Sequence, residues 1–341
     1  MLEGWRKQRT GRLGLDPQST ASYLATVRRL RSTTQAEPWE WTSELFDEWM
    51  EDLVSTRELA PSTLRLYQGR IRAFCDYATS PDYDWSRRCL EMFGAEPRQI
   101  ADIEACRRHL QDYEGTTERL VLTREEVELF FAHADAKVGE IVASGRKGAL
   151  AAYRFSAAAK ITYGWGLRAN EVAKLDVTDF YRNPRQPQHG DRGMLLVRHG
   201  KSSRGQPPKR RSVATYFPWA PAVVDDYIDN IWSKAPHKVA EALWVTERGT
   251  RLAPRDLSDR FKSYREELGL PRSLTFHSLR RSYATHLFEA DVDVEFIRRQ
   301  LGHKYLTTTL GYIHASEAAA NRLMDAALRS INEEYGRRVS P

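Results

Sequence analysis

The chain has 341 residues, with 52 Lys and Arg against 46 Asp and Glu, which gives a formal charge of +6. This length exceeds one typical domain and favours two domains of unequal size, and the basic balance favours a polyanionic partner. Cys75, Cys89 and Cys106 share no disulfide or metal spacing, and no apolar stretch approaches roughly 18 residues. These features exclude a disulfide-stabilised secreted domain and a membrane-spanning chain, and we expect a cytoplasmic protein.

Three helices are predicted in a first domain over residues 1–115. Start signals stand near residues 19, 42 and 62, and each is followed by apolar residues at helical spacing. The apolar residues expected in these helices are Tyr23, Leu24, Val27, Leu30, Leu45, Phe46, Trp49, Met50, Leu64, Leu66, Ile71 and Phe74. Arginines among them are candidate contacts to a polyanion: Arg28, Arg29, Arg31, Arg65 and Arg70. The alternative for this domain is a helical protein-interaction module.

The end of the first domain is predicted from composition. Residues 81–117 are rich in Pro, Gly and aromatic side chains, which favours irregular structure ahead of a short helix. The stretch 112–120 is polar enough to be a linker, so we place the boundary near Gly115. The second domain then covers residues 116–341.

The second domain is predicted to open with a long helix. Thr123 and Glu126 have the spacing of a capping box, in which each caps the other's backbone N–H. A further helical pattern over 150–175 is broken at Gly164–Gly166. Arg168 is therefore expected to start, or closely precede, a new helix.

A β-hairpin and more helices follow. Residues 194–197 and 212–216 have the composition of two strands, after a Pro- and Gly-rich loop at 182–193. Helices are expected at about 220–232, 255–267, 277–289 and 293–301. The fold class is thus mainly α with a small β-hairpin or sheet in the second domain. The tail 316–331 is amphipathic, and it could pack on its own domain or on a neighbouring protomer.

Four short motifs of the second domain suit phosphodiester chemistry. They are Arg168 in GLRANE, Lys201 in GKSSRG, HSLRR at 277–281, and LGH at 301–303 followed by Tyr312. Guanidinium forks of Arg168 and Arg280 match phosphate oxygens, whereas an ammonium can give a proton to a departing oxygen. His277 can accept the proton of a tyrosine near neutral pH, and His303 can donate to a phosphate oxygen. A phenol such as that of Tyr312 can form a covalent phosphate ester.

Other chemistries fit these residues poorly. The histidines come with no H-E-x-x-H and no Cys-x-x-Cys, so we expect no metal. Position 195 is Leu where a phosphate-binding P-loop ahead of Lys201 would need Gly, so nucleotide hydrolysis is not expected. No cofactor is expected either.

The order Arg, Lys, His-x-x-Arg, His, Tyr resembles that of the tyrosine recombinases, the family of phage integrases and chromosome-dimer resolvases. The resemblance implies a helical, SAM-like core-DNA-binding domain ahead of a catalytic domain. It implies that Tyr312 is the nucleophile of a 3′-phosphotyrosyl intermediate and that Glu171 supports the first arginine. It also implies cleavage and rejoining of double-stranded DNA at short, inverted-repeat sites by a tetramer of identical or related subunits, in the bacterial nucleoid, in the service of a mobile element.

Several alternatives stay open. The connection GKSSRGQPPKRR is longer than the G-K-G-x-K-x-R of many relatives, so Lys209 is a second candidate for the general acid. Further candidate DNA contacts in this domain are Lys209, Arg210 and Arg281. A strand relaxase of the type IB topoisomerase kind and a catalytically silent DNA-binding regulator are the competing functions.

Overall fold

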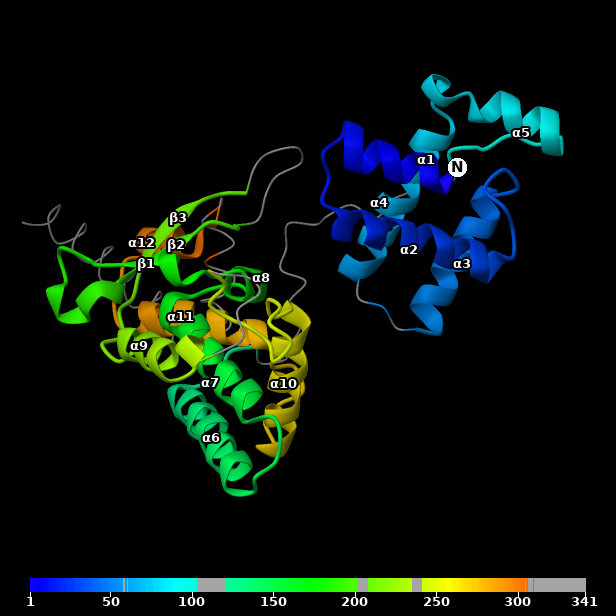
Figure 1. The fold of residues 1–341 in the computed structure, drawn as a ribbon. Coiled ribbons are helices and arrows are strands. Elements are labelled where there is room, and N and C mark those ends of the chain that lie inside the picture. The colour runs from blue at the N-terminus through cyan, green and yellow to red at the C-terminus, as the bar shows by residue number, and fades with distance from the viewer. Residues whose placement is uncertain are drawn as a thin grey trace, which may run out of the picture. The chain divides into compact units, whose positions relative to one another are not determined.

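The computed structural model describes residues 1–57, 59, 61–102, 120–200, 208–234, 241–303, 305 and 309. The chain divides into two compact units, one within Met1–Gly115 and the other within Thr116–Ser202 and Pro208–Pro341 (Figure 1). In the described ranges, no helix is long and apolar enough to cross a membrane. That the first unit clamps DNA and the second carries catalysis stays a prediction.

The first unit is all helical. Its elements are α1 (Leu2–Lys7), a π-helical turn (Gln8–Arg12), α2 (Pro17–Thr34), α3 (Ser43–Ser55), α4 (Pro61–Ala78), a 3-10 turn (Pro81–Tyr83) and α5 (Trp85–Phe93). Its core gathers apolar side chains of α1 to α4, with the Trp5 ring packed edge-on against Phe74 at 5.1 Å between centroids. The predicted second helix is confirmed, since the Thr42 side chain accepts a hydrogen bond from Leu45 N at its start.

Three details of the first unit differ from the prediction. The structure adds α1, which the burial of Trp5 stabilises although few apolar residues surround it in sequence. The next helix begins at Pro17 because the Asp16 carboxylate accepts from Ser19 N, an Asp-Pro start that is earlier than the predicted position 19. Leu66 is exposed, since it lies two positions, or about 200°, around the helix from buried Leu64.

The second unit is built around one buried helix. Its elements are α6 (Arg124–Ala143), α7 (Ala149–Trp165), α8 (Ala169–Ala173), β1 (Phe180–Tyr181), β2 (Met194–Val197), β3 (Arg211–Ala214), α9 (Ala220–Asn230), α10 (Pro254–Glu267), α11 (Phe276–Glu289) and α12 (Val294–Leu301), with 3-10 turns at Val177–Asp179, Pro187–Arg192 and Trp232–Lys234. Helix α7 packs against α6, α9 and α11 (Figure 1). Small side chains at Ala157, Ala158 and Ala159 let these helices approach it closely.

The predicted hairpin is part of a three-stranded antiparallel sheet of order β1-β2-β3. Strand β2 pairs with β3 in the register Leu195 with Val213, and both side chains are buried. The two residues of β1 were not predicted, because so short a strand has no alternation of its own and depends on its partner. The capping box of Thr123 and Glu126 and the four later helices are confirmed. The mainly α fold with a small sheet is therefore confirmed.

The break between α7 and α8 determines where Arg168 lies. Gly166 ends α7 with φ +64°, and Leu167 N bonds back to Thr162 O at 3.0 Å, which turns the chain sharply. Arg168 then takes the N-cap position of α8, as the sequence predicted. A Cβ at position 166 would lie 2.5 Å from Cδ1 of buried Tyr283, so this turn packs directly on α11.

Gly166→Ala is expected to lower the free energy of unfolding by about 2–5 kcal/mol. An L-residue in the left-handed region costs about 1–2 kcal/mol, and overpacking against Tyr283 adds about 1–3 kcal/mol. Gly269→Ala is the matched control, because Gly269 has the same φ of +64° and nothing within 4 Å of the added carbon. Urea unfolding measures both variants, and equal losses would contradict the packing part of this argument.

Candidate active site

Two helix ends supply the histidine motifs. His277 and Arg280 lie in the first turn and a half of α11, which opens at Thr275. Helix α12 ends at Gly302 with φ +64°, and His303 N then bonds to Arg298 O at 3.1 Å. This left-handed end turns the chain so that His303 is buried beside Arg280.

The buried carboxylate of Glu171 joins three arginines. Its two oxygens accept 2.8 Å bonds from Arg211 Nη1 and Nη2, and Oε1 also accepts from Arg168 Nη1 at 2.7 Å. Arg280 Nη1 lies 3.5 Å from Oε2. Burial raises the pKa of Glu171, but the hydrogen bonds and charge of Arg211 and the charges of Arg280 and Arg168 outweigh it and lower that pKa to about 2. The carboxylate is thus charged and holds the arginines together.

Arg280 is completely buried and links two helix ends. It donates to Gly166 O at 2.7 Å and to Leu301 O at 2.6 Å, and its Nη2 lies 3.1 Å from His303 Nε2. A guanidinium cannot accept a hydrogen bond, so Nε2 of His303 is the acceptor. The proton of the neutral ring is then on Nδ1, which donates to Thr309 Oγ1 at 3.0 Å.

This arrangement changes one expectation about His303. Burial, followed by the charges of Arg280, Arg168 and Arg211, lowers its pKa to about 3, so the ring is neutral at pH 7. Donation to a phosphate oxygen, which the sequence suggested, would require that Nε2 lose Arg280 and gain the ring proton, or that Nδ1 leave Thr309. In the described arrangement His303 instead orients the second arginine.

His277 has the protonation state that a proton acceptor needs. Burial, and then the charges of Arg280, Arg281 and Arg168, lower its pKa to about 4. The ring is therefore neutral at pH 7 and has a lone pair for a phenolic proton.

A basic pocket with a volume of 350 Å³ opens beside these groups. Its lining residues are Arg168, Gly200, Lys209, Arg210, Arg211, Arg298, Arg299, Gly302 and His303. Six of them carry cationic side chains and none is acidic, which suits a phosphate group. Lys209, the second candidate acid, lies in this lining, and Gly200 N bonds to Lys209 O at 3.1 Å across the base of the connection. Lys201 and Tyr312 lie outside the described residues.

Arg211 is the site residue that the sequence analysis missed. It is the last residue of Lys209-Arg210-Arg211, which has the K-x-R spacing of the relatives' pattern, but the sequence analysis used that pattern only for the lysine. Its position at the start of β3, opposite Glu171, depends on the packing of the sheet against α8 and α12. No local sequence signal contains that information.

The candidate arginines of the first unit differ in their surroundings. Arg29 donates to Tyr67 OH at 2.6 Å, and Arg70 donates to Thr26 Oγ1 at 3.0 Å, so both are held by neutral groups across α2 and α4. Arg31 instead pairs with Glu37, which offsets its charge. Arg28 is exposed, Arg65 is half-buried, and in the second unit Arg281 is half-buried.

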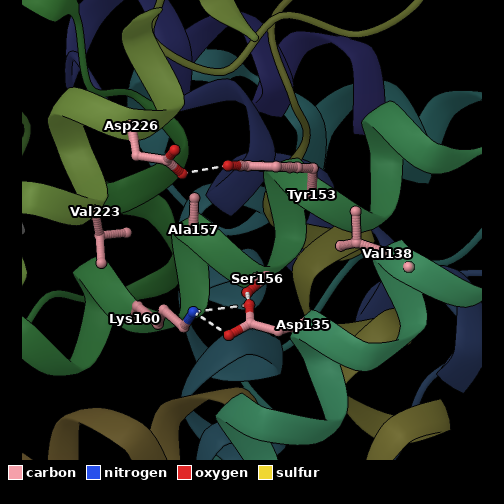
Figure 2. A pocket seen from close by; sticks show the side chains of 9 residues that line it. Asp135, Val138, Tyr153, Ser156, Ala157, Lys160, Val223 and Asp226 are labelled. Carbon is pink, nitrogen blue, oxygen red and sulfur yellow. Dashed lines mark hydrogen bonds and ion pairs between the residues drawn. The ribbon is translucent and has the colours of Figure 1, made fainter. Parts of the chain in front are cut away.

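Another pocket of the second unit, with a volume of 320 Å³, lies between α6, α7 and α9 and shares no lining residue with the basic pocket (Figure 2). Lys160 pairs there with Asp135, which also accepts from Ser156, and the Tyr153 hydroxyl bonds to Asp226 (Figure 2). The pocket therefore holds one cation, Lys160, against two carboxylates, Asp135 and Asp226, a balance that disfavours DNA. Among the described residues, no group of three His, Cys, Asp or Glu side chains could hold a metal ion.

The protein is expected to lose stability as the pH falls below 6.5. Burial comes first among the causes that lower the pKa of His277 and His286 to about 4 and that of His303 to about 3. The unfolded chain binds these protons near pH 6.5 and the folded chain does not, so the free energy of unfolding falls from pH 6.5 to about pH 4. Thermal unfolding from pH 8 to 4.5 measures this, and a constant midpoint would contradict it.

Known proteins are similar to this chain in sequence. A model described as "Phage integrase family" matches residues 121–319. The chain is 30% identical over 295 residues to tyrosine recombinase XerC 2 of Ralstonia nicotianae, covering 85% of this chain and 74% of that protein. It is 28% identical over 314 residues to tyrosine recombinase XerC of Methylobacterium sp., covering 82% of this chain and 90% of that protein.

Solved structures share the fold. The XerH site-specific recombinase bound to a palindromic difH substrate matches with a TM-score of 0.65 and 20% identity, over 96% of this chain and 83% of that chain. The Tn1549 transposon integrase in complex with transposon right end DNA matches with a TM-score of 0.60 and 16% identity, over 95% and 98% of the two chains. At these identities the likeness concerns the fold alone.

Proposed function

This chain belongs to the phage integrase family, and we propose that it is a site-specific recombinase that cleaves and rejoins DNA through a 3′-phosphotyrosyl bond to Tyr312. The observation that carries the proposal is the 350 Å³ pocket, whose lining holds Arg168, five further cationic side chains and the neutral His303. Such a pocket suits the extra negative charge of a phosphoryl transition state.

The residues divide the reaction among them. The Tyr312 oxygen attacks the phosphorus as its proton passes to the neutral His277, and the bond from phosphorus to the 5′ oxygen breaks. That oxygen takes a proton from Lys201, or from Lys209, which lies at the pocket. The Arg168 guanidinium donates hydrogen bonds to the non-bridging phosphate oxygens. Arg280 donates to the same oxygens when its side chain turns away from His303. Rejoining reverses each transfer, with the bond energy stored in the phosphotyrosine.

The partner is double-stranded DNA with short, inverted-repeat sites, bound by a tetramer. The first unit contributes arginines such as Arg29 and Arg70, and the second contributes Lys209, Arg210 and Arg281. XerH, a neighbour by fold, was solved on a palindromic substrate, which agrees with an inverted-repeat site. The recombination event served, in this proposal, is movement of a mobile element, as for the Tn1549 integrase whose fold it shares.

Covalent trapping tests the function and identifies the target sequence in the same experiment. Fragmented genomic DNA of the organism that encodes the protein is incubated with it, and the fragments that stay bound in detergent are sequenced. The proposal predicts that one inverted-repeat sequence is enriched. Two copies of that sequence on a supercoiled plasmid should then exchange flanking segments. Relaxation without exchange would favour the topoisomerase-like alternative, and binding without covalent trapping would favour a regulator.

A further inference from the structure

Arg211 contacts two elements of the active site besides its own strand. From the start of β3 it donates to both oxygens of Glu171 on α8, at 2.8 Å each. Its Nε donates at 2.8 Å to the carbonyl of Gln300 near the end of α12. All three guanidinium nitrogens therefore bind protein groups, and the side chain is only 13% exposed.

The stem of Arg211 also fits the turn that carries His303. A Cβ at Gly302 would lie 2.9 Å from Arg211 Cδ and 3.2 Å from Nε, so the absence of a side chain at 302 lets the stem approach. A second link joins the same elements, since Ala214 N donates to Gln300 Oε1 at 3.1 Å. Strand β3 thereby fixes the end of α12.

The charge arrangement shows what Arg211 does for its neighbours. It occupies both Glu171 oxygens as a fork, so the Arg168 side chain shares only Oε1 through Nη1 and Arg280 stays at 3.5 Å from Oε2. The backbone N of Arg168 also donates to Oε2, at 2.9 Å. Without Arg211, the charged Glu171 would lose two of its donors and would attract the guanidiniums of Arg168 and Arg280 more closely, away from a phosphate. A lysine could replace one of these bonds but not the fork.

We propose that Arg211 is a positioning residue for strand cleavage, which holds Glu171 and the Gly302–His303 turn so that Arg168 keeps its donors for the phosphate. The expected effect on the cleavage rate rests on the proposed function. The expected effect on the Gly302–His303 turn does not. The proposal assigns to Arg211 no proton transfer, because a guanidinium does not release a proton near neutral pH.

The test compares Arg211→Met, Arg211→Lys and Arg251→Met. Arg251 is the matched control, since it likewise donates to a carbonyl (Leu175, 2.9 Å) and a carboxylate (Asp176, 2.6 Å) but does not line the pocket. Single-turnover cleavage of a nicked site is measured at saturating protein, together with DNA affinity and the melting temperature. Hydrogen exchange at the Gly302 and His303 amides is followed in the same variants without DNA.

Arg211→Met is expected to cleave roughly 100-fold more slowly, on the scale of a lost transition-state donor, with DNA affinity little changed. Arg211→Lys should recover part of the cleavage rate. Hydrogen exchange at the Gly302 and His303 amides should be faster in Arg211→Met, but in neither Arg211→Lys nor Arg251→Met. The proposal would be overturned if Arg211→Met and Arg251→Met lost the same cleavage rate in proportion to their melting temperatures. It would also be overturned if hydrogen exchange at Gly302 and His303 did not change in Arg211→Met. A wild type that never cleaves, with the exchange difference present, would refute the proposed function and leave the effect on the turn supported.

Discussion

Tyr312→Phe is expected to form no covalent complex with DNA while binding its site as tightly as the wild type. The substitution removes one oxygen, the atom that would form the phosphate ester, and keeps the ring. A nicked DNA carrying the trapped site is incubated with each protein, and a denaturing gel then separates the adduct from free strands. The wild type should accumulate adduct, and the variant should show none.

Tyr305→Phe is the matched control for this experiment. Tyr305 lies seven residues earlier and is 58% exposed, so it is the alternative nucleophile if the register of the motif is shifted. It should form adduct at the wild-type rate. An adduct that persists in Tyr312→Phe and disappears in Tyr305→Phe would assign the chemistry to Tyr305 instead.

Local signals explain why most helix positions could be predicted. Thr42 and Thr123 accept bonds from the backbone three residues on, and Gly166 and Gly302 take the left-handed conformation that few other residues adopt. Each signal acts within one turn of chain, so it can be recognised without knowing the fold. Those two glycines also place Arg168 and His303, which is why their neighbourhood in the sequence was informative.

Contacts between distant segments explain what could not be predicted. The fork of Arg211 on Glu171 joins residues 40 apart, and the contact of Arg280 with Gly166 O joins residues 114 apart. Arginine composition alone cannot distinguish a buried arginine that links two helix ends, such as Arg280, from an exposed arginine such as Arg28. Helix α1 and strand β1 depend in the same way on partners that only the folded chain supplies.

Arg168→Ala is expected to slow single-turnover cleavage by about 10²–10³-fold, or about 3–4 kcal/mol of transition-state stabilisation. Arg168 lines the pocket and is 25% exposed, so its guanidinium can reach a phosphate while Glu171 fixes one edge of it. Glu171 keeps Arg211 and Arg280 in the variant, and folding should survive. Arg168→Lys should recover little of the rate, because an ammonium cannot fork onto two oxygens.

Arg192→Ala provides the matched control for the loss of a charge. Arg192 pairs with Asp225, is 22% exposed in the same unit and lies outside the lining of the pocket. Its variant should cleave at the wild-type rate, and both variants should melt within a few degrees of the wild type. If Arg168→Ala instead cleaved as fast as Arg192→Ala, the phosphate would not be held by Arg168. The cluster around Glu171 would then be a structural ion-pair network, and the groups left to bind the phosphate would be the pocket cations Lys209, Arg210, Arg298 and Arg299.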